Sequence, residues 1–576
     1  MTIDASLRQQ VEAWIREDPD PATRRELQEL LDTGAEAELR DRFAGTLRFG
    51  TAGLRGLLGG GPHRMNRAVV IRATAGLCTY LLRTVPDAAE RGVAVGFDGR
   101  RMSRQFARDV AEVVAGYGLR AHVFESVVPT PLLAYASLRV NAAAGVMVTA
   151  SHNPPDYNGY KVYWGNGAQI IPPHDEGIAA CIAALGPLRE IPRVPREQSA
   201  KVLPFSAAIR AEYLARVKAL ALHRETPRDL KIVYTAMHGV GGALLLDALS
   251  DAGFCQVNVV AEQQEPDGDF PTVAFPNPEE EGAMDMALAL AKERGAELVL
   301  ANDPDADRLA AIVRHEGAYR RLSGNELGCL LAHYLLDQGP TLDKRLVLCS
   351  VVSSPMLLSI GHAHHARAEQ TLTGHKWIHN RAIELEKEGY TFVMGFEEAL
   401  GYAVSSFVRD KDGISAAAVL CDMAAWCKSQ GRTLVDELER AWRRYGMYLS
   451  DQFSVVLPGA EGAARIASLM KRARREAPEA FGGAAVVATQ DFATGIRRTL
   501  DGEESALAFP RADVVVYELA GGHRAMLRPS GTEPKLKFYV DVRVEVADDE
   551  PTTAALERGR GLLAGIAADF RARLAP

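Results

Sequence analysis

The sequence predicts an α/β protein with three consecutive α/β domains, whose sheets are mixed and largely parallel, and a C-terminal α+β domain. Apolar strand-like runs alternate with helix-like segments over most of the chain, which is typical of parallel sheets covered by helices. Three of these runs end in polar loops, namely TASHNP, NDPDADR and GFEEALGY. After Tyr448 the pattern changes, and the alternating run LKFYVDVRVEV indicates an antiparallel sheet exposed on one face.

The composition is that of a multidomain globular protein. The chain has 576 residues, more than a single hydrophobic core normally supports, and 47% of them are hydrophobic. The net charge of −8 supplies no basic field for nucleic acid. Because no apolar run is long enough to cross a bilayer and no signal peptide is recognisable, we expect no membrane contact. The seven cysteines form no CxxC pair, so we expect reduced thiols and a cytoplasmic location.

Four domains are expected, at residues 1–205, 206–320, 321–447 and 448–576. The first begins with a helical arm over residues 1–44, where apolar residues recur at helical spacing. Helices are then expected at 72–82, 105–116, 242–249, 284–294, 325–336, 376–388, 414–428, 435–445, 460–475 and 552–571. Strands are expected at 93–97, 122–125, 142–148, 230–236, 256–260, 297–301, 345–350, 391–395, 452–456, 514–519 and 535–546.

Two glycine-rich stretches interrupt this pattern. In LRFGTAGLRGLLGGGP, glycines surround Arg55, so the backbone must turn sharply or approach a ligand closely. An arginine there could bind a phosphate, and a flexible linker is the alternative. The turn 239–242, GVGG, lacks the full GxGxxG spacing, which favours close packing of a strand on a helix over dinucleotide binding.

The stretch TASHNPPDYNGYK, residues 149–161, follows a buried strand and predicts a rigid polar loop. Ser151 lies at the strand exit beside His152, and Lys161 follows ten residues later. A serine in that position can carry a covalent group. Residues 153–156 could equally be ordinary turn chemistry, and this stretch alone leaves both interpretations open.

The segment NDPDADR indicates a magnesium site. Asp303, Asp305 and Asp307 alternate, so in an extended backbone their carboxylates would point to one side. Like charges at this spacing repel unless a cation neutralises them, and an all-oxygen ligand set suits Mg²⁺. An EF-hand is excluded because Arg308 and Arg314 stand where that loop requires Gly and Glu. An acidic turn remains the alternative.

Two further loops offer groups for a sugar phosphate. Glu397 and Glu398 follow a predicted strand, and because adjacent side chains point in different directions we expect at most one to face a given ligand. The segment RPSGTEPK brings together donors that can clamp a dianionic phosphate. These are Arg528, Ser530, Gly531, Thr532 and Lys535.

These four loops, in this order, resemble the α-D-phosphohexomutase superfamily, which contains phosphoglucomutases and phosphomannomutases. The resemblance extends from about Arg48 to Tyr539. The segments FGTAGLRG and TLTGHKWI and the helical arm resemble in particular the branch of bacterial phosphoglucomutases and phosphopentomutase-type enzymes. The resemblance implies four domains around a central cleft, with one loop from each.

The resemblance also implies roles for individual residues. Ser151 would be phosphorylated, and one Mg²⁺ per chain would be held by its phosphate together with Asp303, Asp305 and Asp307. Arg55, His152 and Lys161 would lie near the transferred phosphate, with Lys161 as general base. The residues that would contact substrate or the phosphoserine are Arg308, Thr373, Gly374, His375, Glu397, Arg528, Ser530 and Thr532. Many members carry a serine where this chain has Ala399, which leaves sugar discrimination open.

The implied activity is that of a phosphoglucomutase. It would interconvert glucose 1-phosphate and glucose 6-phosphate through a phosphoserine enzyme, with glucose 1,6-bisphosphate as intermediate or activator. The alternatives are a phosphopentomutase or phosphomannomutase on the same scaffold, a metal-dependent phosphatase, or a non-catalytic sugar-phosphate sensor. Its partners would be small sugar phosphates, and the chain would be a monomer or a homodimer.

Overall fold

The computed structural model describes residues 3–47, 53–457, 459–530 and 535–574. It divides into two compact units. Unit 1 comprises Met1–Leu322 and Gly401–Trp426, and unit 2 comprises Ser323–Leu400 and Cys427–Pro576. The chain therefore enters unit 2, returns to unit 1 for the segment Gly401–Trp426, and then completes unit 2.

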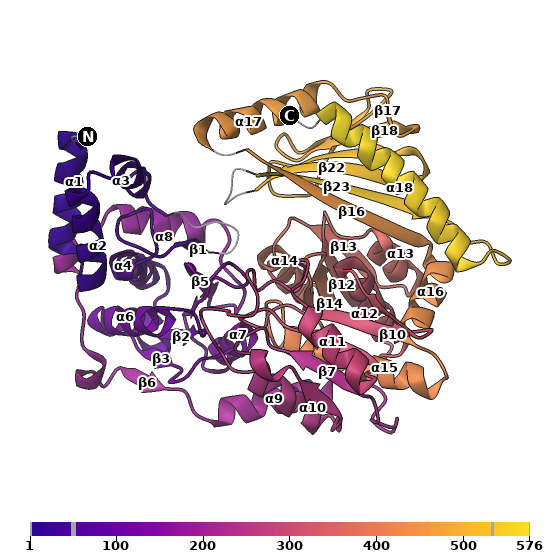
Figure 1. Cartoon of the computed structure of the whole chain (residues 1–576), viewed down its shortest axis with the longest axis horizontal. Coiled ribbons are helices and arrows are strands. Elements are labelled where there is room, and N and C mark those ends of the chain that lie inside the picture. The colour runs from indigo at the N-terminus through magenta and orange to yellow at the C-terminus, as the bar shows by residue number, and fades with distance from the viewer. Residues whose placement is uncertain (1–2, 48–52, 458, 531–534, 575–576) are drawn as a thin grey trace. The chain divides into compact units, whose positions relative to one another are not determined.

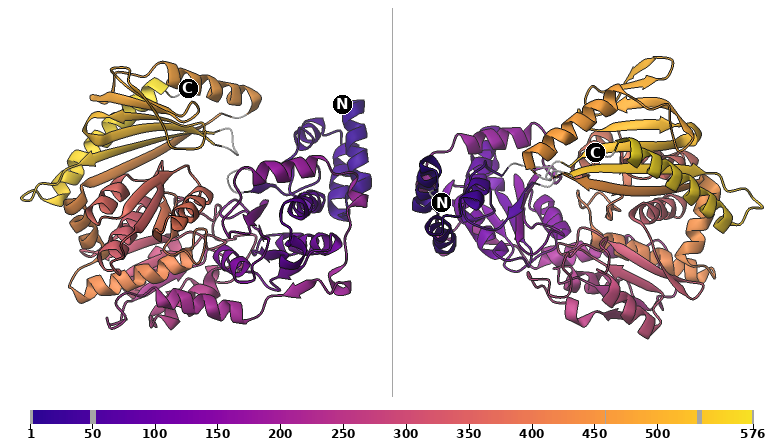
Figure 2. Two further views of the ribbon diagram at one scale, coloured as in Figure 1. Left: turned by 180° about the vertical axis from the view of Figure 1, so that it is seen from behind. Right: turned by 45° about the horizontal axis from the view of Figure 1, so that its top comes forward.

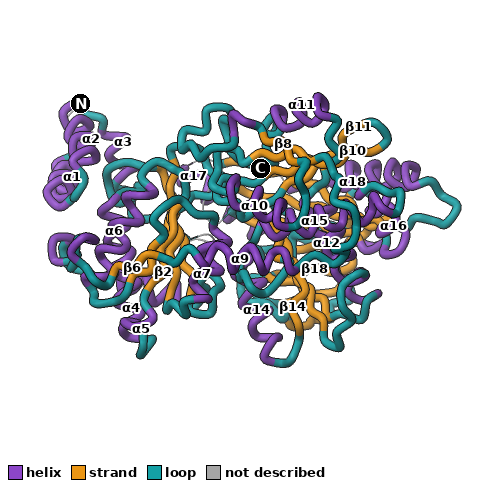
Figure 3. Tube along the Cα trace, turned by 90° about the horizontal axis from the view of Figure 1, so that it is seen from below, coloured by secondary structure: helices purple, strands orange, loops and turns teal. Residues whose placement is uncertain are grey.

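The first sheet of unit 1 has the strand order β1-β5-β4-β2-β3-β6. The pairs β4–β2, β2–β3 and β3–β6 are parallel, whereas β5 pairs antiparallel with both β1 and β4. Helix α6 covers one face of the sheet and α7 the other (Figure 3). Between sheet and helices lies a core that includes Leu77, Val95, Phe106 and Val146.

The elements of this part are α1 (Ala5–Glu17), α2 (Pro21–Asp32), α3 (Glu36–Arg42), β1 (Leu54–Leu57), α4 (Arg67–Thr84), α5 (Ala88–Arg91), β2 (Val93–Phe97), α6 (Ser103–Gly116), β3 (Ala121–Val123), α7 (Thr130–Arg139), β4 (Ala144–Val148), β5 (Tyr157–Trp164), α8 (His174–Ala183) and β6 (Val202–Pro204). Helices α1 to α3 form the expected arm (Figure 1). Helix α4 begins where the Asn66 side chain accepts a hydrogen bond from the Val69 amide.

Two segments expected to be loops are strands. Arg55 lies in β1, and Lys161 lies in β5, where it pairs with Met147 of β4. The glycines and prolines nearby hid these strands, since strand propensity is low for both residue types. The antiparallel return of β5 has a direct consequence, because it brings Lys161 back beside the end of the strand that leads to Ser151.

The second sheet of unit 1 has the order β11-β10-β9-β7-β8, with β7 parallel to β8 and β9 and the remaining pairs antiparallel. Its elements are α9 (Ala208–Ala219), β7 (Ile232–Thr235), α10 (Gly242–Asp251), β8 (Val257–Val259), α11 (Asp285–Arg294), β9 (Leu298–Ala301), β10 (Ala310–His315) and β11 (Ala318–Arg321). The segment that returns from unit 2 contributes β15 (Gly401–Ala403) and most of α15 (Gly413–Ser429).

The GVGG turn was expected to allow close packing of a strand on a helix, and the structure shows it packed closely against the acidic loop. A side chain on Gly239 would meet the Pro304 backbone at 2.5 Å, and one on Gly241 would meet the Ala306 side chain at 2.7 Å. The Val240 amide donates a hydrogen bond to the Pro304 carbonyl at 2.8 Å. The glycines are therefore required because the loop that carries the aspartates lies directly on them.

Unit 2 contains a parallel sheet, β13-β12-β14, and a larger antiparallel sheet ordered β16-β23-β22-β21-β18-β19-β20. Helix α18 crosses one face of the larger sheet (Figure 2), and Phe538, Val540, Ile566 and Phe570 lie in the core between them. The elements of the first sheet are α12 (Gly324–Asp337), β12 (Arg345–Ser350), α13 (Met356–Ala363), β13 (Arg367–Thr371), α14 (His375–Lys387), β14 (Thr391–Glu397) and α16 (Leu434–Tyr445). Those of the second are β16 (Met447–Val456), α17 (Gly459–Arg475), β17 (Ala480–Phe481), β18 (Ala484–Asp491), β19 (Ile496–Thr499), β20 (Glu504–Ala506), β21 (Val515–Leu519), β22 (His523–Pro529), β23 (Lys535–Val544) and α18 (Thr552–Leu574).

The predicted fold class is confirmed, and the errors are local. Most predicted elements are present with ends shifted by a few residues. Other elements were not predicted, among them helices α7, α8, α9 and α13 and strands β10, β13, β18 and β22. Helix α7 is buried on nearly every side, so its sequence carries no amphipathic period. No helix among the described residues is long and apolar enough to cross a membrane. The four-domain division at residues 205, 320 and 447 stays a prediction.

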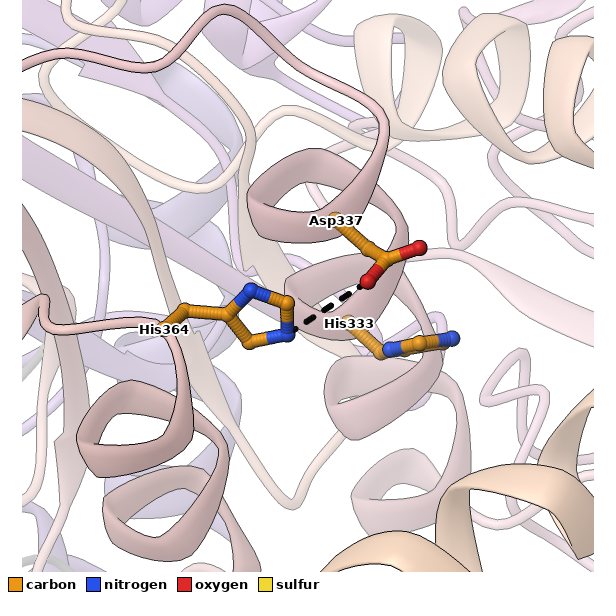
Figure 4. Close-up of side chains that lie close together, drawn as sticks. All are labelled: His333, Asp337 and His364. Carbon is orange, nitrogen blue, oxygen red and sulfur yellow. Dashed lines mark ion pairs between the residues drawn. The ribbon is translucent and has the colours of Figure 1, made fainter.

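A polar cluster with two buried histidines, His333 and His364, connects three helices of unit 2 (Figure 4). His333 and Asp337 lie one turn apart on α12, and His364 follows α13, with its Nε2 3.8 Å from Asp337 Oδ1. The Tyr445 hydroxyl on α16 lies 2.9 Å from His333 Nδ1 and 2.7 Å from His364 Nε2. Glu437 Oε1 lies 3.1 Å from His333 Nε2. The cluster thus ties α12, α13 and α16 together through hydrogen bonds.

This cluster predicts a pH-dependent stability. Burial and the nearby Arg444 guanidinium lower the pKa of His364 to about 4, whereas an unfolded histidine titrates near 6.5. Between these values the unfolded chain binds the proton and the folded chain does not, so stability falls as the pH drops from about 6.5 to about 4. The share of His364 in this loss is up to about 3 kcal/mol.

The measurement is urea denaturation followed between pH 7 and pH 4 for wild type and His364→Asn. The variant is expected to lose less stability over this interval than wild type. The matched control is His362→Asn at an exposed position on α13, which should keep the wild-type slope. Equal slopes for wild type and His364→Asn would contradict the assignment.

Candidate active site

Ser151 lies in a tight loop just beyond β4. Its backbone is left-handed, with φ of 52°, and only 3% of the residue is exposed. Its Oγ donates a hydrogen bond to Asp303 Oδ2 at 2.8 Å and lies 3.1 Å from His152 Nδ1. The serine hydroxyl therefore faces the acidic loop directly, as a group that is to carry a phosphate beside a metal would.

The three aspartates converge through a turn. They were expected to alternate in extended backbone, but residues 304–306 form a turn in which Ala306 has φ of 57°. All three carboxylates are fully buried, and one oxygen from each lies within 4.8 Å of the others. Because the backbone turns here, the carboxylates of Asp303, Asp305 and Asp307 lie around one point.

Positive groups surround this acidic loop. Lys161 Nζ donates to Asp305 Oδ2 at 2.7 Å and to Asp307 Oδ2 at 2.9 Å, and Lys411 Nζ lies 3.0 Å from Asp307 Oδ2. Burial opposes the charged form of Asp307, but Lys161 and Lys411 outweigh it and hold the pKa well below the usual range. Asp303 faces the other aspartates instead, so burial and repulsion raise its pKa well above the ordinary value.

The acidic loop fits a divalent cation. Within the part of the chain that the structure describes, Asp305 Oδ1 and Asp307 Oδ1 are buried without a hydrogen-bond partner. Buried carboxylate oxygens without partners are costly, and a hard cation with oxygen ligands satisfies them. Asp303 Oδ2, which now accepts from Ser151, lies in the same group. The donor set of the three aspartates suits Mg²⁺.

Arg55 and His152 also contact the serine loop. Arg55 Nη1 donates to Asn153 Oδ1 at 2.7 Å, so the strand residue reaches the serine loop. Desolvation, with Arg308 nearby, lowers the pKa of Arg55 to about 10, and the guanidinium stays charged at neutral pH. Desolvation and the same arginines lower the pKa of His152 well below its usual value, which keeps the imidazole neutral. Arg308 itself is fixed by its amide, which donates to Asp303 Oδ1 at 3.0 Å.

Lys161 is an ammonium in this arrangement. Burial opposes its charge, but Asp305 and Asp307 outweigh burial and raise its pKa. A general base needs a neutral amine, so the proton must leave Lys161 before it can accept one. The general-base role stays a prediction.

Three residues of this centre were missed from the sequence. The Thr130 hydroxyl at the start of α7 donates to Asp305 Oδ2 at 2.6 Å. Lys411 comes from the returning segment, in RDKDG, where charged residues just before an apolar helix were the available signal. Arg100 follows β2, and its guanidinium donates hydrogen bonds to backbone carbonyls of the serine loop. That strand also ends in a polar DGR turn, which was the signal for this residue.

In unit 2, the predicted sugar-binding residues lie together. Glu397 Oε1 accepts a hydrogen bond from the Gly374 amide at 2.6 Å, and His375 Nε2 lies 4.0 Å from Glu397 Oε2. The buried Thr373 Oγ1 has no hydrogen-bond partner among the described residues. Glu398 points elsewhere, since its Oε2 accepts from Ser350 and Ser353 at 3.2 and 3.1 Å. The two glutamates thus diverge.

The phosphate loop joins the ends of β22 and β23. Arg528 in β22 pairs with Lys537 in β23, and the Ser530 amide donates to the Lys535 carbonyl at 2.7 Å. Gly531 and Thr532, also predicted for this loop, lie outside the described residues. Burial and the charge of Glu398 raise the pKa of Tyr539 in β23, and the charge of Arg528 opposes this rise.

A serine hydroxyl beside a cation-binding carboxylate cluster and a ring of arginine and lysine is the arrangement of phosphoryl-transfer enzymes. Three family models match the chain, described as phosphoglucomutase/phosphomannomutase, alpha/beta/alpha domain I at residues 46–188, domain II at 211–317 and domain III at 323–445. The chain belongs to this phosphoglucomutase/phosphomannomutase family of mutases.

Three relatives carry different substrate names. A probable phosphoribomutase of Schizosaccharomyces pombe is 38% identical, with 95% of each chain covered. A probable phosphomannomutase of Haemophilus influenzae is 43% identical, with 83% of this chain and 93% of the relative covered. A phosphoglucomutase of Staphylococcus epidermidis is 37% identical, with coverage of 87% and 92%. The similarity identifies the family and leaves the sugar open.

Proposed function

We propose that this protein is a phosphoglucomutase that interconverts glucose 1-phosphate and glucose 6-phosphate through a phosphoserine at position 151. The observation that carries the proposal is the contact of Ser151 Oγ with Asp303 in the buried acidic loop. A serine placed only for folding would not need to lie beside a carboxylate cluster in which two buried oxygens, Asp305 Oδ1 and Asp307 Oδ1, have no hydrogen-bond partner among the described residues.

The cycle follows from the groups present. The phosphoryl group on Ser151 passes to the free hydroxyl of the sugar monophosphate, so the bond from phosphorus to Oγ breaks and a bond to the sugar oxygen forms. The hydroxyl proton goes to a base, for which Lys161 is the candidate once it is neutral. The resulting glucose 1,6-bisphosphate reorients, and its other phosphoryl group returns to Ser151 Oγ. The bond from phosphorus to that sugar oxygen breaks, and the sugar oxygen takes the proton back from the base.

The chain's own residues stabilise this transfer by charge and position. The Arg55 guanidinium lies at the serine loop, where it can neutralise the moving phosphoryl group. A bound Mg²⁺ supplies further positive charge for the same group. In unit 2, Glu397, His375 and Thr373 are the groups for sugar hydroxyls, and Arg528 and Ser530 are the groups for the distal phosphate.

A pentose phosphate is the second candidate substrate. The relative named phosphoribomutase matches over 95% of this chain. In addition, Ala399 provides no hydroxyl for a sugar hydrogen bond. The test is to compare kcat/KM on glucose 1-phosphate, mannose 1-phosphate and ribose 1-phosphate at one Mg²⁺ concentration. If kcat/KM is highest on ribose 1-phosphate, the proposed substrate becomes the pentose phosphate instead of the glucose phosphate. Steady release of inorganic phosphate with each sugar would instead indicate a phosphatase.

Arg528→Ala is expected to weaken substrate binding. The loss of a charge-assisted hydrogen bond to phosphate should raise KM about 10- to 100-fold. Because Arg528 is not part of the serine centre, intact-mass analysis should still find the phosphate on Ser151. Arg498→Ala, at an exposed ion pair on β19, is the matched control and should keep the wild-type KM. An unchanged KM for Arg528→Ala would remove Arg528 from the clamp.

A further inference from the structure

Arg100 is a buried arginine that the cycle above does not use. It follows β2 in the turn Asp98-Gly99-Arg100, and only 4% of the residue is exposed. Its guanidinium lies over the Phe270 ring, 4.9 Å from the centroid. Asp98 Oδ2 lies 3.4 Å from Arg100 Nε, so the charge is paired. Burying a charged group costs desolvation free energy, so we expect the buried Arg100 guanidinium to make specific contacts.

The contacts of Arg100 are with the backbone of the serine loop. Nη2 donates to the Ser151 carbonyl at 2.6 Å and to the Asn153 carbonyl. Nη1 donates to the Pro154 carbonyl at 2.8 Å and to the Tyr157 carbonyl at 3.2 Å. One planar guanidinium therefore holds four carbonyl oxygens that span the loop from the nucleophile to the start of β5.

The loop held in this way includes an unfavourable backbone conformation. Ser151 has φ of 52°, in the left-handed region that residues with a side chain adopt rarely. Such a conformation persists only where its surroundings impose it. The Ser151 amide donates to Thr149 Oγ1 at 2.9 Å, and Arg100 fixes the carbonyl on the other side of the same residue.

Asp98 fixes the position of Arg100. Asp98 Oδ1 accepts hydrogen bonds from the Ser103 hydroxyl at 2.6 Å and from the Arg100 amide at 3.0 Å. The strand end β2 and the first turn of α6 therefore define the position of the guanidinium. Strand β2 pairs in parallel with β4, the strand that leads to Ser151. Arg100 and the serine loop therefore both follow strands of one rigid sheet.

We propose that Arg100 is a positioning residue that holds the Ser151 loop in its left-handed turn, so that the phosphoryl group on Oγ is directed toward the Asp303 loop. This role deepens the proposed function and depends on it. Arg100 contacts neither substrate nor the reacting atoms, so it sets the rate of phosphoryl transfer and leaves substrate binding unchanged. Lysine cannot replace it, because one ammonium cannot reach four carbonyls in a fork geometry.

The test compares Arg100→Lys and Arg100→Ala with wild type. Arg100→Lys keeps a charge beside Asp98, so it is the variant expected to fold. Its kcat should fall about 10- to 100-fold, as expected for a displacement of a reacting group by about 1 Å, and its KM should stay within about threefold. The ³¹P NMR resonance of the phosphoserine should also shift or broaden.

Arg108→Ala is the matched control, because Arg108 lies on α6, its side chain is 47% exposed, and its ion pairs are with Glu112 and Glu197, outside the serine loop. It should keep the wild-type kcat and the wild-type ³¹P resonance. A wild-type kcat and an unshifted resonance for Arg100→Lys would overturn the positioning role. A fall in kcat/KM caused by KM alone would also overturn it.

The proposed function has a separate readout in the same experiment. If wild-type protein carries no phosphoserine and shows no mutase turnover, the proposed function fails. If wild type is phosphorylated and active while Arg100→Lys matches it, only the positioning role fails. Arg100→Ala adds the larger perturbation and should lower kcat further than Arg100→Lys at a temperature where its circular dichroism matches wild type.

Discussion

Ser151→Ala is expected to abolish mutase turnover and to remove the covalent phosphate. The alanine lacks the oxygen that carries the phosphoryl group, and the Asp303 Oδ2 acceptor loses its hydrogen-bond donor. Activity should fall about 1,000-fold or more, since the oxygen that forms the bond to phosphorus is lost. The measurement combines a coupled mutase assay with intact-mass analysis, in which wild type should contain a species heavier by one phosphate.

The control for this change is Ser250→Ala, at an exposed serine at the end of α10. It should leave both the activity and the phosphorylated species unchanged. An active Ser151→Ala variant, or one that keeps its phosphate, would contradict the assignment of Ser151 as the phosphoryl carrier.

Asp305→Asn is expected to remove Mg²⁺ binding and most of the activity. Asp305 offers a buried Oδ1 with no hydrogen-bond partner among the residues described, and the substitution takes away both this ligand and one negative charge. Mg²⁺ affinity should fall about 100-fold or more, and kcat should fall by a similar factor because the cation supplies several kcal/mol of charge stabilisation.

Calorimetric titration with Mg²⁺ measures the affinity without turnover. In wild type, Mg²⁺ should also raise the melting temperature, because it relieves the repulsion among three buried carboxylates. The variant should show neither heat nor shift. Asp285→Asn, at an exposed position in the first turn of α11, is the control and should behave as wild type. An unaltered Mg²⁺ titration in Asp305→Asn would exclude Asp305 as a ligand.

The sequence predicted the parts of the site that are continuous along the chain. Ser151 with His152, and Asp303 with Asp305 and Asp307, were recognisable because each group lies in one short polar loop after an apolar strand. The geometry within those loops was less predictable. The aspartates converge through a left-handed Ala306 rather than through extended backbone, since local turn chemistry overrides the simple alternation of side chains.

Residues that join the site from elsewhere were not predicted. Lys411 lies 3.0 Å from Asp307, and Arg100 lies 2.6 Å from the Ser151 carbonyl, yet each is far from its partner in sequence. Nothing in a single sequence reports such long-range contacts. Strands β1 and β5 were missed for a different reason, because Gly and Pro lower strand propensity even where strand pairing compensates, here of β1 with β5 and of β5 with β4.

The return of residues Gly401–Trp426 to unit 1 determines when the catalytic centre can form during synthesis. When a ribosome has synthesised only the first 322 residues, Ser151 and all three aspartates are present but Lys411 is not. At this stage Asp307 has Lys161 but not Lys411 as an ammonium partner. The centre therefore reaches its final charge balance only after the first part of unit 2 has emerged. A gene fragment that ends at Leu322 would encode most of unit 1 by length, but Asp307 in its acidic loop would have Lys161 as a partner and would lack Lys411.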